Sequence, residues 1–292
     1  MSVGVYDSGF GGLSVLRAIR ARMPDLDCVY LGDSGRAPYG GRDANVILDL
    51  SEQCVERLFE EGCSIVVVAC HTVSCVALRH LQARYAGPER RILGVTIPAA
   101  EAAVRAVRAV QAGDAASAGR GGIAFIGTAR TVASQTFSVE VRKLSDVTVT
   151  EIAAPLLAPI VEEGWEESVI AVMAVKRYLG DLSAIDTLVL GCTHYPLLMA
   201  AFLSAVPDGV RVLDPSPAVA DALARWFARH PEFTEGGSGK LRVLSTGDTR
   251  AFARHGQRFL GEVLPTIEHV AESGGRLAHR SGPSTPVGQV VR

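Results

Sequence analysis

The strongest structural signal in the sequence is the stretch Ile65-Val66-Val67-Val68-Ala69-Cys70-His71-Thr72. Its first part is apolar and mostly β-branched, which is typical of a strand that other elements of a parallel α/β sheet cover on both faces. The same arrangement, an apolar strand that runs straight into a cysteine, returns as Leu188-Val189-Leu190-Gly191-Cys192-Thr193-His194. We interpret the pair as a weak internal repeat of two similar α/β units.

Strand and helix patterns alternate on both sides of these two stretches. Ligands in open parallel sheets bind beyond the carboxyl ends of the strands, so each cysteine is expected at the mouth of its own sheet. The sequence therefore predicts two similar domains, each a mainly parallel sheet flanked by helices, with the active site in the cleft between them. Helices are expected, among others, at Leu13 to Met23, Ala44 to Glu61, Thr131 to Lys143 and Glu167 to Leu179.

The chain is expected to cross between the domains twice, near Thr96 and near Val210. The first α/β domain is then discontinuous and comprises residues 1–96 plus 212–271, and the second comprises residues 97–211. The tail, 272–292, is rich in Gly, Ser and Pro, and we expect it to be disordered.

Composition indicates an ordinary globular protein. Of the 292 residues, 48% are hydrophobic and 21% charged, and the formal net charge is −2. Such a balance carries no electrostatic footprint for nucleic acid or an anionic membrane surface, so neither is an expected partner. The apolar runs are far shorter than the roughly 20 residues of a membrane span, and the first residues lack the pattern of a secretory signal. We expect a cytoplasmic protein.

The six cysteines lack the density of a disulfide scaffold, and no C-x2-C pair supports a zinc site, so we expect reduced thiols and no metal. Taken singly, Cys70 and Cys192 are most simply small buried hydrophobes. Their pairing favours a catalytic role for both, because each cysteine has a possible proton partner. For Cys192 this is His194, two residues further along the chain. For Cys70 it is Asp7, at the end of a strand that is expected to lie beside the strand leading to Cys70.

Other segments have ordinary interpretations as well as functional ones. The turn Asp7-Ser8-Gly9-Phe10-Gly11-Gly12 lacks the spacing of a dinucleotide or P-loop site and fits a carboxylate better. Pro38-Tyr39-Gly40 reads as a simple turn, Thr128 with Thr131 as a helix cap, and Glu162 as a solvated carboxylate.

Taken together these segments resemble the glutamate racemases, of the aspartate/glutamate racemase superfamily, from Val3 to about Val270. The resemblance rests on six motifs in order: DSGFGGLSV at Asp7, GDSGRAPYG at Gly32, ACHT at Ala69, IGTARTV at Ile126, APIVEEG at Ala158 and LGCTHYPLL at Leu190. It implies interconversion of L- and D-glutamate without a cofactor, in which one cysteine removes the α-proton and the other delivers one. It also implies that the product feeds peptidoglycan synthesis.

The resemblance assigns roles to matching positions in this chain. Cys70 and Cys192 match the two acid/base cysteines, Asp7 and His194 their helpers, and Glu162 a further position linked to catalysis. Substrate contacts are implied for Ser8, Pro38, Tyr39, Gly40, His71, Thr72, Thr128, Thr131 and Thr193.

His71 departs from the family pattern, which has asparagine directly after the first cysteine. Imidazole is bulkier than an amide and can become cationic near neutral pH. Three interpretations stay open: a tolerated variant that still binds the α-groups of the substrate, a device that lowers the pKa of Cys70, or a mark of a changed substrate. We favour the first.

Two other functions are compatible with the sequence. One is a racemase of aspartate or another small acidic amino acid, which a substrate panel distinguishes. The other is a binding protein on the same scaffold that has lost catalysis, for which His71 is the sole sequence feature. A homodimer is compatible with the sequence, but an exposed apolar patch cannot be read from it.

Overall fold

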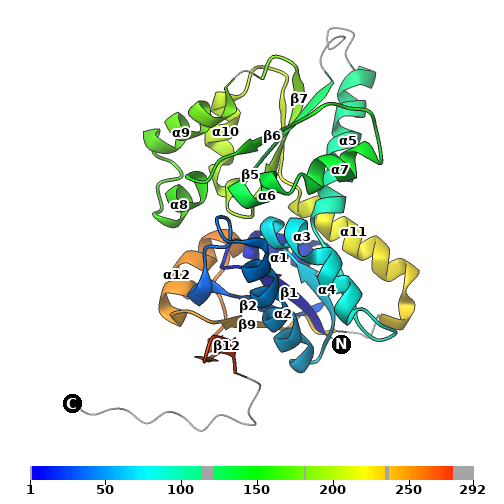
Figure 1. Ribbon diagram of the computed structural model, residues 1–292, viewed down its shortest axis with the longest axis vertical. Coiled ribbons are helices and arrows are strands. Elements are labelled where there is room, and N and C mark those ends of the chain that lie inside the picture. The colour runs from blue at the N-terminus through cyan, green and yellow to red at the C-terminus, as the bar shows by residue number, and fades with distance from the viewer. Residues whose placement is uncertain (1, 114–120, 181, 234–236, 279–292) are drawn as a thin grey trace, which may run out of the picture.

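The fold, seen in a computed structural model, has two α/β lobes, one above the other in Figure 1. The structure describes residues 2–113, 121–180, 182–233 and 237–278. One lobe contains a six-stranded sheet of order β10-β9-β2-β1-β3-β4, and the other a four-stranded sheet of order β6-β5-β7-β8. All neighbouring strands in both sheets are parallel. The predicted fold class is confirmed.

The strands of the larger sheet are β1 (Ser2–Asp7), β2 (Asp27–Gly32), β3 (Cys63–Val68), β4 (Arg91–Gly94), β9 (Leu241–Ser245) and β10 (Ile267–His269). Those of the smaller sheet are β5 (Gly122–Gly127), β6 (Val149–Ala153), β7 (Ile185–Gly191) and β8 (Arg211–Leu213). Every residue of β7 is buried, and β3 is buried except for Ser64, in keeping with their unbroken apolar runs.

The helices of the first lobe are α1 (Leu13–Arg22), α2 (Ala44–Glu60), α3 (His71–Val76), α4 (Leu78–Tyr85), α11 (Ser216–Arg229) and α12 (Thr249–Leu260). Those of the second are α5 (Thr96–Gly113), α6 (Ala129–Ala133), α7 (Thr136–Arg142), α8 (Leu157–Glu162), α9 (Val169–Leu179) and α10 (Met199–Ala205). Short 3-10 helices span Ser34–Arg36, Tyr195–Leu198 and Pro231–Phe233. No helix in the described ranges is long and apolar enough to cross a membrane.

The largest hydrophobic core cluster continues from one lobe into the other. It contains Val5 of β1 and Leu16 of α1 together with Leu188 of β7 and Phe202 of α10. Because the two sheets share this core, the cleft between them has a packed base.

The predicted domain division stays a prediction, with one adjustment. The boundary between 211 and 212 falls inside β8, which pairs with β7, so the chain leaves the smaller sheet only after Leu213. The predicted helix from Thr131 to Lys143 is in fact two helices, because Gln135 has a φ of 52°, a left-handed conformation that a continuous helix cannot contain.

The disordered tail predicted from residue 272 is wrong at its beginning. Residues 272–277 form an antiparallel hairpin of β11 (Glu272–Ser273) and β12 (Arg276–Leu277). The Leu277 side chain is buried in the core cluster on the α2 side of the larger sheet, which offsets the cost of ordering this polar segment. Residues 279–292 lie outside the described part of the chain.

Candidate active site

The two cysteines stand at equivalent places in the two sheets. Cys70 follows β3 and is the N-cap residue of α3, and Cys192 comes directly after β7. β1 lies beside β3, which brings Asp7 and Ser8 to the same edge as Cys70. In the other lobe β5 lies beside β7 and brings Thr128 to the edge where Cys192 stands.

Both edges open onto one cavity of about 270 Å³. Of the residues singled out in the sequence, twelve line it: Ser8, Pro38, Tyr39, Gly40, Cys70, His71, Thr72, Thr128, Glu162, Cys192, Thr193 and His194. Asp7 and Thr131 are buried behind this lining. A volume of this size suits a small amino acid and is too small for a dinucleotide.

The Cys70 thiol lies in an apolar and anionic environment. Burial, and after it the negative charge of Asp7, raises the pKa of Cys70 to about 12. Its hydrogen-bond partner is the hydroxyl of Ser8, with 3.4 Å between Oγ and Sγ. At neutral pH Cys70 is therefore a protonated thiol and an acid rather than a base.

In addition to burial, the charge of Asp7 raises the pKa of Cys70, while the carboxylate oxygens of Asp7 accept hydrogen bonds from other groups. Its Oδ1 accepts a hydrogen bond from the amide of Gly9 at 2.9 Å, and its Oδ2 accepts one from the hydroxyl of Thr193 at 3.3 Å. Burial raises the pKa of Asp7, and the nearby His194 counteracts this. The bond to Thr193 ties the first lobe to the turn that contains Cys192.

Cys192, His194 and Glu162 form a continuous polar chain. The Sγ of Cys192 is 3.8 Å from Nδ1 of His194, and Nε2 of the same ring is 3.1 Å from Oε1 of Glu162. Burial alone would lower the pKa of His194, but its hydrogen bonds to Cys192 and Glu162 raise it to about 10. A proton on His194 is thus favoured over a neutral ring at physiological pH.

Three threonines join the lobes on another side of the cavity. The Oγ1 atom of Thr72 in α3 lies 3.0 Å from that of Thr128 and 3.1 Å from that of Thr131. Thr128 also caps α6, with its Oγ1 accepting a hydrogen bond from the amide of Thr131. Thr131 therefore holds two cavity-lining hydroxyls in place rather than lining the cavity itself.

The turn Pro38-Tyr39-Gly40 of the first lobe also contacts the second lobe. The amide of Arg130 donates a hydrogen bond to the carbonyl oxygen of Gly40 at 3.0 Å. A Cβ at position 40 would stand 2.9 Å from the Cβ of Thr128, so the close approach of these two segments requires glycine.

His71 is buried and neutral. Its ring centroid is 6.3 Å from that of Phe125, and Nδ1 is buried without a hydrogen-bond partner. Burial lowers the pKa of His71 to about 4, so the ring carries no positive charge at neutral pH. A neutral imidazole cannot stabilise a thiolate by charge, which argues against the second interpretation of His71.

Sequence reasoning missed part of the lining: Gly9, Ala37, Gly41, Ala129, Pro155, Ala158 and Pro159. Most are direct neighbours of residues that were singled out, but Pro155 comes from the segment after β6 and carries no chemical signal. No cluster of His, Cys, Asp or Glu that could hold a metal is present among the described residues.

Comparison with known proteins places the chain among racemases. The family model described as Asp/Glu/Hydantoin racemase matches residues 14–223. Glutamate racemases of Roseobacter denitrificans and Paracoccus denitrificans are 38% and 39% identical to the chain, over 89% of it and 97% of each relative. The solved glutamate racemase of Thermus thermophilus, in complex with beta-chloro-D-alanine, is 32% identical, with a TM-score of 0.79 over 92% of this chain and 96% of that one.

Proposed function

The chain belongs to the Asp/Glu/Hydantoin racemase family and is an isomerase of the amino-acid racemase type, and from this premise we propose that it interconverts L-glutamate and D-glutamate. The observation that carries the proposal is the pair of thiols, Cys70 and Cys192, which face one small cavity from opposite lobes. The relatives of 38% and 39% identity named as glutamate racemases favour glutamate over a shorter acid.

The proposed reaction needs two proton transfers and no cofactor. One cysteine thiolate takes the α-proton, so that the Cα–H bond breaks and an S–H bond forms. The planar carbanion then takes a proton from the thiol on its other face. The enzyme is left with the proton on the first sulfur and the thiolate on the second, which is the starting state for the opposite enantiomer.

The two thiols are prepared differently. For Cys192, protonated His194 at 3.8 Å provides the compensating charge, and Glu162 keeps the ring oriented. Burial and Asp7 raise the pKa of Cys70 to about 12, so its thiolate must be stabilised by the bound substrate, whose ammonium group brings positive charge. Asp7 is proposed to act on Cys70 by charge and Ser8 by its hydrogen bond.

The carbanion needs donors for the negative charge that moves onto the α-carboxylate. The hydroxyls of Ser8, Thr72, Thr128 and Thr193 line the cavity and can supply hydrogen bonds. Pro38, Tyr39, Gly40 and His71 complete the proposed contacts, and Thr131 supports them from behind. The apolar remainder of the lining excludes water, which strengthens each of these interactions.

The test is solvent deuterium incorporation at Cα of D- and L-glutamate, followed by NMR without added cofactor. We expect incorporation with racemisation by the wild type and loss of racemisation in Cys70→Ala and in Cys192→Ala. Faster turnover of aspartate than of glutamate would replace the substrate proposed here, and racemisation retained by either variant would refute the two-cysteine mechanism. A role of the product D-glutamate in peptidoglycan synthesis is part of the proposal.

We also propose that a second copy of the chain is a partner. Val169 and Met173, one turn apart on α9, are 70% and 65% exposed, and Trp165 and Ile170 extend the same apolar face. Exposed acidic residues, Glu163 and Glu167, precede this face, and exposed basic residues, Lys176 and Arg177, follow it. Antiparallel pairing of α9 with α9 of a second copy would bury the apolar residues and bring opposite charges together.

A further inference from the structure

The segment 37–41 forms a wall of the cavity, with all five residues in contact with it. It connects a 3-10 helix, Ser34–Arg36, to α2, so no sheet or helix ladder holds it. Two residues hold it from inside the first lobe. The buried hydroxyl of Tyr39 donates a hydrogen bond to Oδ2 of Asp33, and Nε of Arg42 donates one to the carbonyl oxygen of Pro38 at 3.0 Å. The position of this wall therefore depends on the position of Asp33.

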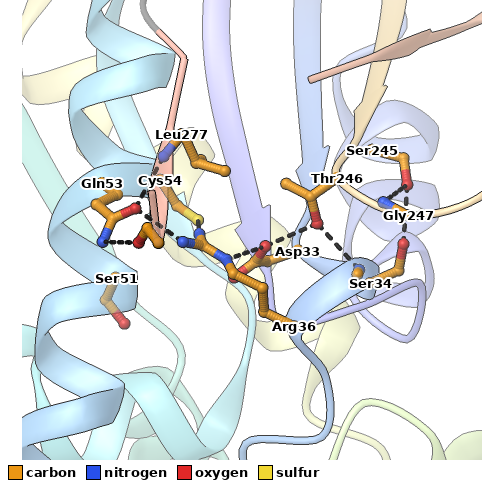
Figure 2. A network of polar contacts seen from close by, with 12 residues as sticks. Asp33, Ser34, Arg36, Ser51, Gln53, Cys54, Ser245, Thr246, Gly247 and Leu277 are labelled. Atoms are coloured by element: carbon orange, nitrogen blue, oxygen red, sulfur yellow. Dashed lines mark hydrogen bonds and ion pairs between the residues drawn. The ribbon is translucent and has the colours of Figure 1, made fainter. Parts of the chain in front are cut away.

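Asp33 is fully buried and is the centre of a polar network (Figure 2). Its Oδ1 accepts a hydrogen bond from the hydroxyl of Thr246 at 2.7 Å, and both of its oxygens lie 2.9 Å from Nε of Arg36. A buried carboxylate needs such partners, because an unpaired buried charge is costly. Arg36 thus helps to fix the position of the Asp33 carboxylate, and through it the position of Tyr39.

Arg36 is held in turn by Gln53 of α2. Its Nη1 donates a hydrogen bond to Oε1 of Gln53 at 2.7 Å. The same Oε1 accepts a hydrogen bond from the amide of Leu277 in β12 at 3.0 Å, as Figure 2 shows. Gln53 therefore joins the C-terminal hairpin to the arginine.

The hairpin is itself firmly docked. The side chain of Leu277 packs in the same core cluster as Tyr39 and Tyr6. The carbonyl oxygen of Ala278 accepts a hydrogen bond from Nη1 of Arg57 at 2.9 Å. A chain of contacts thus runs from Leu277 through Gln53, Arg36 and Asp33 to Tyr39.

We propose that Gln53, together with the hairpin 272–277, is a positioning element that holds the cavity wall 37–41 in its substrate-binding shape. The proposal rests on the proposed racemase function. None of these residues lines the cavity, so they act through Arg36, Asp33 and Tyr39 and not on the reacting atoms. Loss of the element should weaken substrate binding and leave the two cysteines unaffected.

The test compares Gln53→Met with Gln53→Glu. Methionine has a similar shape but offers no acceptor to Arg36 or to the Leu277 amide, so we expect KM for both enantiomers to rise about tenfold, as for a lost hydrogen bond to a charged group, with kcat within about twofold. Glutamate keeps an acceptor oxygen, but its second oxygen would face Oδ2 of Asp49, which accepts a hydrogen bond from the Gln53 amide nitrogen at 2.9 Å. Gln53→Glu is therefore combined with Asp49→Asn, and this double variant should restore KM to within about threefold of the wild type. Gln82→Met is the matched control: it removes the hydrogen bond of a side-chain amide to the Ile92 carbonyl, remote from the wall, and should leave KM unchanged.

A second pair of variants covers the case in which Gln53→Met does not fold. A chain that ends after Arg280 keeps the hairpin, whereas one that ends after Val270 lacks it, and only the shorter chain should show the raised KM. An unchanged KM in Gln53→Met or in the shorter chain, even with a lowered Tm, would overturn the positioning role. A wild type that does not racemise glutamate would instead refute the proposed function, which separates the two failures.

Discussion

At the scale of single residues, His194 combines burial with a raised pKa. Buried histidines usually lose their proton, yet the contacts with Cys192 and Glu162 raise the pKa of His194 to about 10. Phe10 and Phe259 pack around the ring, with centroid distances of 5.7 and 5.2 Å, and restrict its rotation. A fixed, protonated imidazole is what an adjacent thiolate requires.

Replacing Glu162 tests this arrangement. In Glu162→Gln the negative charge near Nε2 is gone, so the pKa of His194 should fall, and the limb of the kcat/KM profile that reports His194 should move to lower pH. We expect kcat/KM to drop about tenfold, less than the ~10²-fold or more that loss of an acid/base group itself costs. The measurement is kcat/KM for both enantiomers from pH 6 to 10.

Glu89→Gln is the control for Glu162→Gln, because Glu89 is an exposed carboxylate outside the cavity and outside the proposed dimer interface. An identical pH profile in Glu162→Gln and Glu89→Gln would show that Glu162 does not tune His194.

The buried His71 is expected to make the free energy of unfolding depend on pH in the acid range. Its pKa is about 4 in the folded protein, against about 6.5 when unfolded, so between these values the unfolded chain binds more protons. The contribution of neutral His71 to the free energy of unfolding is fully present above about pH 6.5 and is lost as the pH falls through 4. It amounts to at most about 3 kcal/mol. The free energy of unfolding should therefore fall more steeply from pH 7 to 4 in the wild type than in His71→Asn. Parallel curves in chemical denaturation would contradict the buried neutral imidazole.

At the scale of elements, the turn before α1 touches the turn after β7. A Cβ built on Gly11 would stand 2.4 Å from Oγ1 of Thr193 and 2.6 Å from Nδ1 of His194. The first lobe can approach the Cys192 turn this closely only because position 11 has no side chain. Within this turn, Gly11 thus serves contact between the lobes.

Gly11→Ala should therefore displace His194 and damage the site. Overpacking of this kind costs about 1–3 kcal/mol, and we expect a lower Tm together with a loss of kcat/KM of at least about tenfold. Gly87→Ala is the matched control, because a Cβ there meets nothing within 4 Å. Racemase assays and thermal unfolding of the two variants test this prediction. Wild-type activity in Gly11→Ala would mean that the turn before α1 does not lie as close to the Cys192 turn as described.

At the scale of the whole molecule, the apolar face of α9 predicts the oligomeric state. We expect the wild type to sediment as a dimer at micromolar concentration. Met173→Glu places a charge at the centre of the proposed interface and should yield monomers. Val263→Glu alters an even more exposed apolar residue, 84% exposed, in the other lobe and should leave the dimer intact. A wild type that sediments as a monomer, or a Met173→Glu variant that remains dimeric, would exclude this interface.

Local patterns predicted the elements on which the site stands. The strands that lead to Cys70 and Cys192 were predicted because both are unbroken apolar runs, and such runs are independent of distant contacts. The helix break at Gln135 and the hairpin 272–277 were not predicted. The first depends on a left-handed backbone at a residue that rarely adopts one, and the second on the docking of Leu277 into a core formed by residues far away in the chain.

The sequence by itself determined the α/β class and the two cysteines at strand ends, because strand periodicity is a local property. The set of polar residues near the cysteines was implied by the resemblance of short motifs to the glutamate racemases. Only the tertiary structure decided that Ser8 rather than Asp7 contacts the Cys70 thiol, that His71 is neutral, and that Leu277 is connected to Tyr39. These depend on which groups share a buried space and how much water is excluded from it. Burial and long-range contact arise only when the chain is folded, and no spacing along the sequence encodes their geometry.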